Sequence, residues 1–285
     1  MKIHLIANTL REDALEAARS TVSFLREHGV QTGTEGEIAS LVGAPGLPQQ
    51  ELADCDLLIS FGGDGTLIRG AHLASERGTP LLGVYFGRFG FVTQCQPSEI
   101  GAALSLFFDG QARVENRMML QAQLIRSGVV VATLHSLNEA VLQRAATTRM
   151  LEFSVAIDGM TVTQYPADGV IVATPTGSTA YNLSAGGPIV DPQLQALVLS
   201  AITPHTLGAR PLVLQPDSVI EMSVQTRGDA ILSADGQSRL NILSGDQVRI
   251  TRSNRVTRLV VIAENDFLSK LSEKLLWSHS LGDRE

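Results

Sequence analysis

The spacing of apolar residues divides this chain into two regions with different secondary structure. Up to about residue 112, short apolar runs alternate with segments of helical spacing. After residue 113, apolar residues recur at every second position, which is typical of β-strands. Alternating strands and helices favour a parallel sheet covered by helices, whereas consecutive strands favour antiparallel sheets. We therefore expect a Rossmann-like α/β domain over residues 1–112 and a β-rich, sandwich-like domain over residues 113–262.

The remaining segment, residues 263–285, returns to helical spacing. Apolar side chains fall on one side of a helix that we expect between Asn265 and Trp277. Those side chains are Phe267, Leu268, Leu271, Leu275 and Leu276. We expect this tail helix to pack back on the α/β domain.

Individual elements follow from the same patterns. In the first region we expect strands at 2–8, 56–61 and 80–86, and helices at 11–28, 66–77 and 97–108. In the second we expect strands at 119–125, 129–143, 152–158, 160–165, 169–175, 218–226, 230–235 and 246–253. Asp158 and Gly159 form the hairpin turn between two of them.

Composition excludes several classes of protein. The 285 residues are 44% hydrophobic and 18% charged, which is typical of a globular protein, and the net charge of -7 disfavours a nucleic-acid surface. No stretch approaches the roughly 20 apolar residues of a membrane span, and the N-terminus lacks a cleavage site. Cys55 and Cys95 are expected to be reduced thiols. These features favour a cytoplasmic protein with neither a membrane nor a nucleic-acid partner.

The stretch GGDGT follows the expected strand 56–61. Gly62, Gly63 and Gly65 indicate a tight turn, for which positive φ angles are expected, and such a turn can hold a phosphate. Asp64 would repel that anion, so its carboxylate needs a separate explanation. A purely structural alternative is that Asp64 caps the helix beginning near Thr66.

Two common nucleotide-binding solutions are absent from the sequence. The only lysines are Lys2, Lys270 and Lys274, so no lysine is available for a Walker A loop or a Schiff base in the body of the chain. The dinucleotide fingerprint G-x-G-x-x-G also fails, because Ile68 occupies its last glycine position.

The β-rich region contains a polar pair and a longer polar block. Asn138 and Glu139 are adjacent within an expected strand, where neighbouring side chains point to opposite faces unless a turn intervenes. The block ADGVIVATPTGSTAYNLSAGGPIV, residues 167–190, combines hydroxyl residues, glycines and Tyr181 around an apolar strand. Hydroxyls and glycine-turn amides suit phosphates and ribose oxygens, and the tyrosine ring can stack on a base.

These motifs, followed by PHTLGARPLV and SADGQ in that order, resemble the NAD kinases over nearly the whole chain. GGDGT alone is shared with diacylglycerol and sphingosine kinases and, in near form, with phosphofructokinases. The resemblance implies transfer of the γ-phosphate of ATP, with Mg²⁺, to the 2′-hydroxyl of the adenosine ribose of NAD. It also implies a homo-oligomer, a dimer or a tetramer, built through the β-rich domain.

The resemblance also implies residue roles. Asp64 matches the catalytic base that takes the proton of the attacking hydroxyl. The matching binding positions are Gly62, Gly63, Gly65, Thr66, Asn138, Glu139, Arg149, Asp168, Thr179, Ala180, Tyr181, Asn182, Ser184 and Gln237. No residue is assigned to a resident metal, and His205 is interpreted as structural because no carboxylate partner is visible in the sequence.

Some positions depart from the family pattern. Tyr85 and Phe86 replace an asparagine that many bacterial members carry, and Gln94 stands where an acid is common. With so few lysines, phosphate charge must be neutralised by arginine, and Arg69, Arg88 and Arg149 are the candidates.

Two other functions remain open from the sequence. A lipid kinase could use the same glycine turn, but it would have no use for Tyr181 and its hydroxyl neighbours. A non-catalytic dinucleotide sensor would bind the coenzyme without ATP-dependent turnover.

Overall fold

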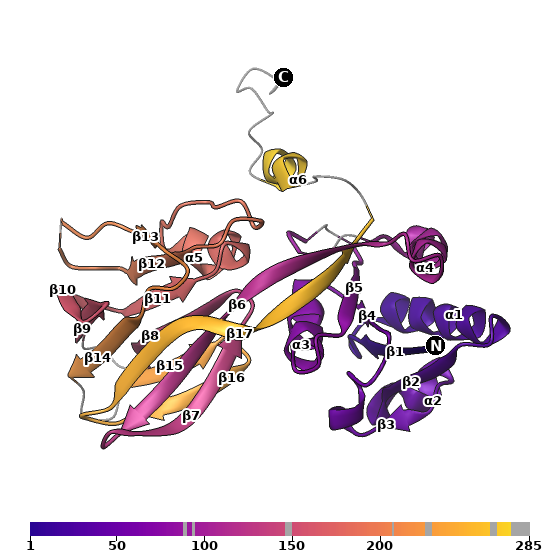
Figure 1. The fold of residues 1–285 in the computed structure, drawn as a ribbon, viewed down its shortest axis with the longest axis horizontal. Helices are drawn as coiled ribbons and strands as arrows, with labels where there is room; N and C mark the ends of the chain where they lie inside the picture. The colour runs from indigo at the N-terminus through magenta and orange to yellow at the C-terminus, as the bar shows by residue number, and fades with distance from the viewer. Residues whose placement is uncertain are drawn as a thin grey trace. The chain divides into compact units, whose positions relative to one another are not determined.

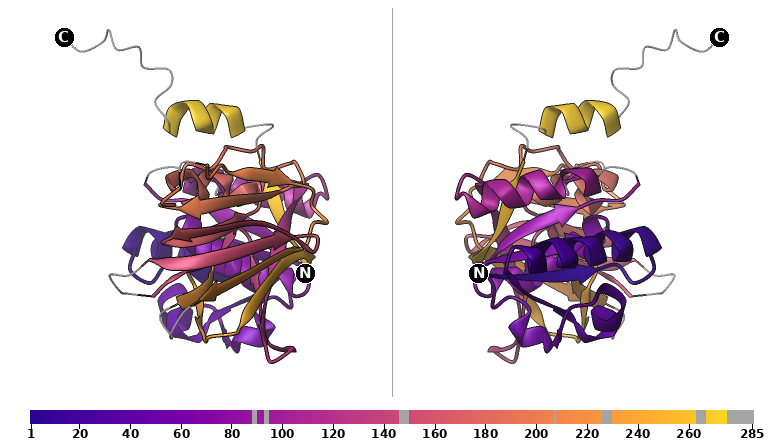
Figure 2. Two further views of the ribbon diagram at one scale, coloured as in Figure 1. Left: turned by 90° about the vertical axis from the view of Figure 1, so that its left-hand side faces the viewer. Right: turned by 90° about the vertical axis from the view of Figure 1, so that its right-hand side faces the viewer.

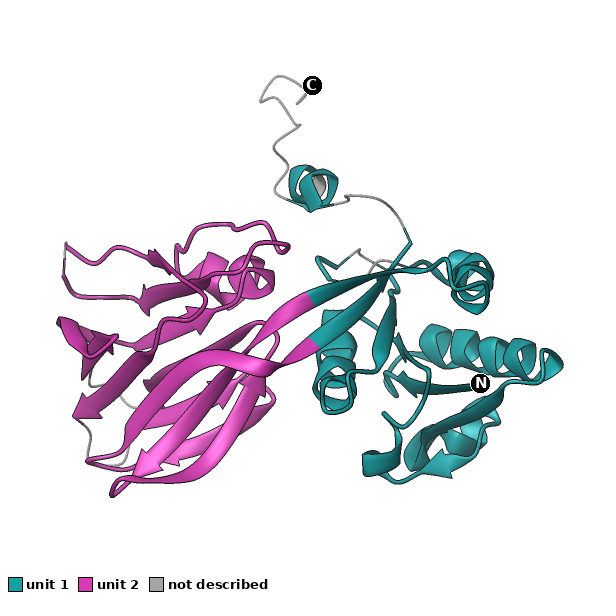
Figure 3. Ribbon diagram, in the orientation of Figure 1, with its two compact units in different colours: residues 1–116, 257–285 teal, residues 117–256 magenta. Residues whose placement is uncertain are grey.

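The computed structural model describes residues 1–87, 90–92, 95–145, 150–206, 208–225, 230–262 and 267–274. The chain forms two compact units (Figure 3). Unit 1 contains residues 1–116 and 257–285, and unit 2 contains residues 117–256. The expected fold class, an α/β unit with a parallel sheet followed by an antiparallel β-sandwich and a short C-terminal helix, is confirmed.

Unit 1 is built on a parallel sheet in the order β17-β5-β4-β1-β2-β3 (Figure 1). Its strands are β1 (Lys2–Ala7), β2 (Gln31–Glu35), β3 (Gly46–Leu47), β4 (Leu57–Phe61), β5 (Pro80–Val84) and the end of β17 (Gln247–Val261). β4 is buried along its whole length, because helices cover both faces of this sheet.

The helices of unit 1 lie on opposite faces of that sheet. α1 (Glu12–Glu27) buries Ala14, Ala18, Val22 and Leu25 against β1, β2 and β4, and it lies in front of the strands in the right-hand view of Figure 2. α3 (Asp64–Ser75) packs against the other face. The remaining helical segments are η1 (Gly36–Ile38), α2 (Ala39–Val42), η2 (Gln49–Glu51), η3 (Pro97–Glu99), α4 (Ile100–Phe108) and α6 (Phe267–Lys274).

Unit 2 is a sandwich of two mainly antiparallel sheets. One sheet contains β6 (Arg113–Arg126), β7 (Val129–Ser136), β9 (Leu151–Ile157), β10 (Met160–Ala167), β14 (Ile220–Gln225) and most of β17. The other has the order β13-β12-β11-β8-β15-β16. Its strands are β8 (Glu139–Arg144), β11 (Gly169–Ala173), β12 (Leu197–Ile202), β13 (Leu212–Leu214), β15 (Ala230–Ala234) and β16 (Ser238–Ile242).

The inner faces of the two sheets form one apolar core. Phe153, Val155 and Met222 from the first sheet join Leu142, Val170 and Leu232 from the second. Two short helical segments, η4 (Thr176–Thr179) and α5 (Tyr181–Ser184), follow β11.

Several elements differ from the sequence expectations. The expected strand 129–143 is interrupted at Leu137 and Asn138, and α3 begins at Asp64 rather than Thr66. The tail helix exposes 67% of Leu268 while it buries Leu271, so its apolar face is narrower than expected. Leu275, Leu276 and Trp277 lie outside the described residues. No helix in the described ranges is long and apolar enough to cross a membrane.

Candidate functional site

The glycine turn lies at the carboxyl end of β4. The Asn8 amide donates to the Phe61 carbonyl (2.9 Å), and the Gly62 amide donates to the Val84 carbonyl (2.9 Å). The ends of β1, β4 and β5 are therefore joined at one edge of the parallel sheet. This is the edge at which ligands of open α/β sheets bind.

Of the three glycines in this turn, Gly62 is needed for space rather than for backbone freedom. Positive φ angles were expected, and that expectation is wrong for Gly62, Gly63 and Gly65. A Cβ on Gly62 would clash with the Thr66 side chain and would lie 3.3 Å from the Asn8 Cβ. A Cβ on Gly63 or Gly65 would meet no atom of the described residues within 4 Å. Gly62 thus permits close packing, while Gly63 and Gly65 are exposed.

Asp64 is the first residue of α3, and its side chain points toward residues 91 and 92. Its carboxylate accepts hydrogen bonds from the backbone amides of Phe91 (3.0 Å) and Val92 (3.4 Å). The helix cap is Gly63. Asp64 is therefore not the cap of α3, because its carboxylate is oriented by the 91–92 segment instead.

Arg69 does not fit the expected role in neutralising phosphate. Its guanidinium forms an ion pair with both Glu35 carboxylate oxygens and donates to the Ala7 carbonyl (3.2 Å). The positive charge is thus already paired within unit 1. Arg88 and Arg149, the other candidates, lie outside the described residues.

Asn138 and Glu139 belong to unit 2, where a turn separates β7 from β8. The backbone amides of Leu137, Asn138 and Glu139 all donate to the carboxylate of Asp235, at 2.7, 2.8 and 3.0 Å. Thr174 secures the same turn, because its hydroxyl donates to the Leu137 carbonyl (2.6 Å) and its amide donates to the Asn138 carbonyl (2.8 Å).

Both side chains of the pair are buried and incompletely hydrogen-bonded. Asn138 and Glu139 are each 7% exposed, and Asn138 Oδ1 and Glu139 Oε2 have no hydrogen-bond partner among the described residues. Burial raises the pKa of Glu139 to about 8, and the charge of Asp235 adds to the effect, although the Tyr181 amide opposes it. Glu139 is accordingly protonated at neutral pH and can donate a hydrogen bond as well as accept one. Unpaired buried polar atoms of this kind require a ligand or water.

The residues after β11 form a compact turn that faces this pair. Gly177 contacts Asn138 so closely that a Cβ at 177 would lie 2.6 Å from the Asn138 Cα. The Ser178 hydroxyl donates to the Pro175 and Val190 carbonyls (2.7 and 3.1 Å), which closes the base of the turn. Thr179 and Ala180 are half-buried, whereas Tyr181 and Ser184 are exposed.

Asn182 has a different environment from its neighbours. Its side chain is fully buried; Nδ2 donates to the Ser178 and Pro188 carbonyls (both 3.2 Å), and Oδ1 accepts from the Ser200 hydroxyl (2.7 Å). A side-chain amide engaged in this way stabilises the turn.

The structure brings most of the unit 2 candidates to one end of the second sheet. Glu139 is paired with Ala173 at the end of β11, and Gln237 lies in the turn that follows β15, next to Asp235. Asp168 precedes β11 and therefore lies at the other end of that strand. Six extended residues separate Asp168 from Thr174, which corresponds to about 20 Å. Asp168 forms an ion pair with Arg144 (2.9 Å) and accepts from the Thr203 hydroxyl (2.5 Å).

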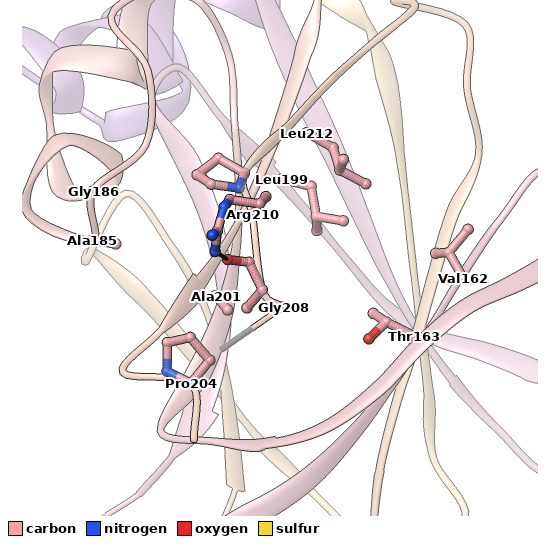
Figure 4. A pocket seen from close by; sticks show the side chains of 12 residues that line it. Val162, Thr163, Ala185, Gly186, Leu199, Ala201, Pro204, Gly208, Arg210 and Leu212 are labelled. Atoms are coloured by element: carbon pink, nitrogen blue, oxygen red, sulfur yellow. Dashed lines mark hydrogen bonds between the residues drawn. The ribbon is translucent and has the colours of Figure 1, made fainter. Parts of the chain in front are cut away.

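A separate cavity of about 400 Å³ lies beside the residues that follow α5 (Figure 4). It is lined by apolar side chains, among them Val162, Leu199 and Leu212, and by Arg210. Asn138, Glu139 and Tyr181 do not line it, so it is distinct from the end of the sheet that carries the polar pair.

Sequence reasoning missed the residues that hold these turns. Asp235, Thr174 and Gly177 were not among the candidates, although the Asp-Gly pair at 235–236 is a hairpin signal of the same kind as Asp158–Gly159. That signal marks a turn, but it does not reveal which distant amides the aspartate binds.

Comparisons with known proteins agree with this architecture. Residues 3–112 match the ATP-NAD kinase N-terminal domain, and residues 137–262 match the ATP-NAD kinase C-terminal domain. An NAD kinase of Moorella thermoacetica is 39% identical over 100% of this chain and 92% of its own length, and one of Desulforamulus reducens is 38% identical over 98% and 99%.

Solved structures extend the likeness to three dimensions. A yeast NADH kinase complexed with NADH matches with a TM-score of 0.93 and 26% identity, over 100% of this chain and 90% of the other. An NAD kinase from Archaeoglobus fulgidus in complex with ATP matches with a TM-score of 0.76 and 26% identity, over 97% and 99%. The chain belongs to the NAD kinase family, which confirms the resemblance of its motifs.

Proposed function

We propose that this protein is an NAD kinase that transfers the γ-phosphoryl group of ATP to the 2′-hydroxyl of the adenosine ribose of NAD, giving NADP and ADP. The observation that carries the proposal is Asp64. Its carboxylate lies at the carboxyl end of β4, between the exposed Gly63 and Gly65, and two backbone amides orient it. The family membership of the chain supports the same reaction.

Asp64 acts as the base in this mechanism. Phosphoryl transfer passes through a loose transition state, so the protein mainly aligns the attacking oxygen and balances charge. The carboxylate of Asp64, within hydrogen-bond reach of the ribose hydroxyl, orients that oxygen and accepts its proton as the O–P bond forms. General base catalysis of this kind contributes about 10²- to 10⁴-fold.

We assign binding of the ATP phosphates to the glycine turn. Gly63 and Gly65 are exposed and leave room for phosphate oxygens, while Thr66 lies in the first turn of α3, where amides and the helix dipole favour anions. Mg²⁺ prefers oxygen ligands and commonly combines substrate phosphates with one or two carboxylates. No residue of the chain is assigned to this ion, because the carboxylate of Asp64 serves as the proton acceptor. An ion bound with ATP would screen the phosphate charge.

We assign binding of NAD to the residues at the end of the second sheet in unit 2. Asn138 and Glu139 offer buried polar atoms that no described residue pairs with, and a protonated Glu139 can donate to a ribose oxygen. The exposed ring of Tyr181 is available for stacking on a base, and the hydroxyls of Thr179 and Ser184 and the amide of Gln237 complete the binding set. Arg149 remains a proposed ligand, and Asn182 acts by shaping the turn.

We further propose a homo-oligomer in which Asp168 serves the site of a neighbouring copy. Its position at the far end of β11 from Glu139 and Thr174 supports this arrangement. Light scattering coupled to size-exclusion chromatography measures the assembly state. If Asp64→Asn and Asp168→Ala oligomers are each inactive, dissociated, mixed and reassembled subunits should regain activity. No recovery in verified mixed oligomers would contradict the sharing of sites.

One assay tests the central proposal. The protein is mixed with Mg²⁺, ATP and NAD, and an NADP-specific dehydrogenase then reports the product. We expect NADP to accumulate with turnover, and only when both ATP and NAD are present. Phosphorylation of a lipid without NADP formation would favour a lipid kinase. Coenzyme binding without product would favour a sensor, and either result would overturn the proposed activity.

A further inference from the structure

The turn after β15 carries an aspartate with three backbone partners. Asp235 Oδ2 accepts from the Leu137 amide, and Oδ1 accepts from the amides of Asn138 and Glu139. The Asp235 amide in turn donates to the Glu139 carbonyl (3.0 Å). The Asp235 side chain therefore fixes the backbone of Asn138, which precedes β8, and of Glu139, which begins it.

The two residues fixed in this way are those with unsatisfied buried atoms. Asn138 and Glu139 are each more than nine-tenths buried, and each has one side-chain oxygen with no hydrogen-bond partner in the part of the chain that the structure describes. Such atoms bind a ligand only if the backbone holds them at the correct positions, because a buried side chain has few alternative rotamers. A shift of about 1 Å in a positioned group can cost about 100-fold.

We propose that Asp235 is a positioning residue for the dinucleotide, which acts through Asn138 and Glu139 and does not touch the substrate. This inference rests on the proposed function. The amides that Asp235 binds belong to unit 2, whereas the glycine turn belongs to unit 1. Asp235 therefore controls affinity for NAD and leaves the glycine turn that serves ATP unaffected.

Asp235 also influences the charge of Glu139. Asp235 is the charged group that acts on Glu139 from the turn after β15. The backbone amide of Tyr181, in α5, donates a hydrogen bond to Glu139. On β11, the residue opposite Glu139 is Ala173, which does not titrate. Because the negative charge of Asp235 raises the pKa of Glu139, its removal should let Glu139 ionise at lower pH. Asp235 therefore favours the protonated form of Glu139, which can donate a hydrogen bond.

The chain contains a matched control at a second Asp-Gly hairpin. Asp158 and Asp235 have nearly the same backbone angle, with φ of 52° and 50°, and each precedes a glycine of positive φ. The Asp158 carboxylate also accepts a backbone amide, that of Val219 (2.8 Å), and its own amide donates to the Val219 carbonyl (2.9 Å). It holds no residue of the candidate site.

The experiment compares Asp235→Asn and Asp235→Gly with Asp158→Asn and Asp158→Gly in the full-length protein. Both replacements tolerate positive φ, so they remove the carboxylate without straining the turn. Asparagine retains an oxygen for two of the three amides, and glycine retains none. The measurements are kcat, KM for NAD and for ATP, the dissociation constant of NAD without ATP, its pH dependence, and Tm.

We expect Asp235→Gly to weaken NAD binding by about ten- to a hundredfold, and Asp235→Asn to weaken it less, with KM for ATP changed less than about twofold. The pH dependence of NAD binding should move to lower pH in Asp235→Asn. The Asp158 variants should lose Tm to a similar extent but retain NAD affinity. Equal effects of both aspartates, or equal changes in KM for NAD and ATP, would overturn the inference. If wild-type protein binds NAD but forms no NADP, the proposed function fails while this comparison of affinities still decides the role of Asp235.

Discussion

Gly177 lies against the backbone of Asn138, and a Cβ at position 177 would lie 2.6 Å from the Asn138 Cα. This contact joins the turn after β11 to the polar pair at the start of β8. Gly177→Ala must displace one of these two segments, because both are backbone and neither can rotate away. We expect a loss of about 1–3 kcal/mol in the free energy of unfolding, together with weaker NAD binding.

Urea denaturation and NAD titration measure both effects. Gly101→Ala in α4 is the matched control, since a Cβ there meets nothing within 4 Å and alanine favours a helix. An unchanged NAD affinity in Gly177→Ala would contradict the proposed link between the turn and Asn138.

Glu139 should make stability depend on pH. Its pKa is raised in the folded protein from 4.5 to about 8, so its contribution is fully present below pH 4.5 and is lost as the pH rises through 8. Glu139→Gln removes the ionisable group. The variant should therefore gain stability relative to the wild type as the pH increases from 5 to 9, by roughly 1.4 kcal/mol at most for each unit of pKa shift.

Urea denaturation at pH 5, 7 and 9 tests this dependence. Glu152→Gln, at an exposed position on β9, is the control and should change stability little at any of these values. A constant difference between Glu139→Gln and wild type across the range would show that Glu139 is not protonated in the folded protein.

Asn182 should contribute to stability more than to catalysis directly. Asn182→Ala removes two hydrogen bonds to the Ser178 and Pro188 carbonyls and leaves the buried Ser200 hydroxyl without its acceptor. We expect a loss of about 2–4 kcal/mol in the free energy of unfolding. The exposed Asn241→Ala is the control. A fully stable Asn182→Ala variant with impaired NAD binding would instead identify Asn182 as a direct ligand.

The Arg69–Glu35 pair should couple only weakly. The two side chains are 40% and 20% exposed, so solvent screens much of their attraction. A double-mutant cycle with Arg69→Gln and Glu35→Gln should give a coupling energy below about 1 kcal/mol that falls as salt increases. A coupling several times larger and insensitive to salt would show that this pair is a buried structural element.

Much of the fold was predictable because periodicity reports burial. The expected strand 56–61 and helix 11–28 correspond to β4 and α1, since both bury unbroken or regularly spaced apolar residues. β2, with the sequence QTGTE, has too few apolar residues to give that signal and forms because it pairs with β1. β12 and β16 were likewise missed, although both pair with neighbours in the second sheet.

The candidate site was predictable only at the level of motifs. The sequence placed Asp64 at a strand end and Asn138–Glu139 within a strand unless a turn intervened, but it could not show that the turn forms or where the backbone amides point. The bonds from residues 137–139 to Asp235 join positions nearly 100 residues apart, and local propensity carries no information about such a contact. Tertiary packing also made Arg69 the partner of Glu35 rather than a free cation.

The most direct test of the central claim is the rate of NADP formation by Asp64→Asn, with NAD affinity and Tm measured on the same preparation. Asparagine preserves the size of the side chain and one acceptor for the 91–92 amides, but it cannot take the proton of the ribose hydroxyl. Asp109→Asn, at an exposed position, is the control. We predict that kcat falls at least about 100-fold while NAD affinity and Tm remain close to those of the wild type. Turnover near the wild-type rate in Asp64→Asn would contradict the assignment of Asp64 as the base.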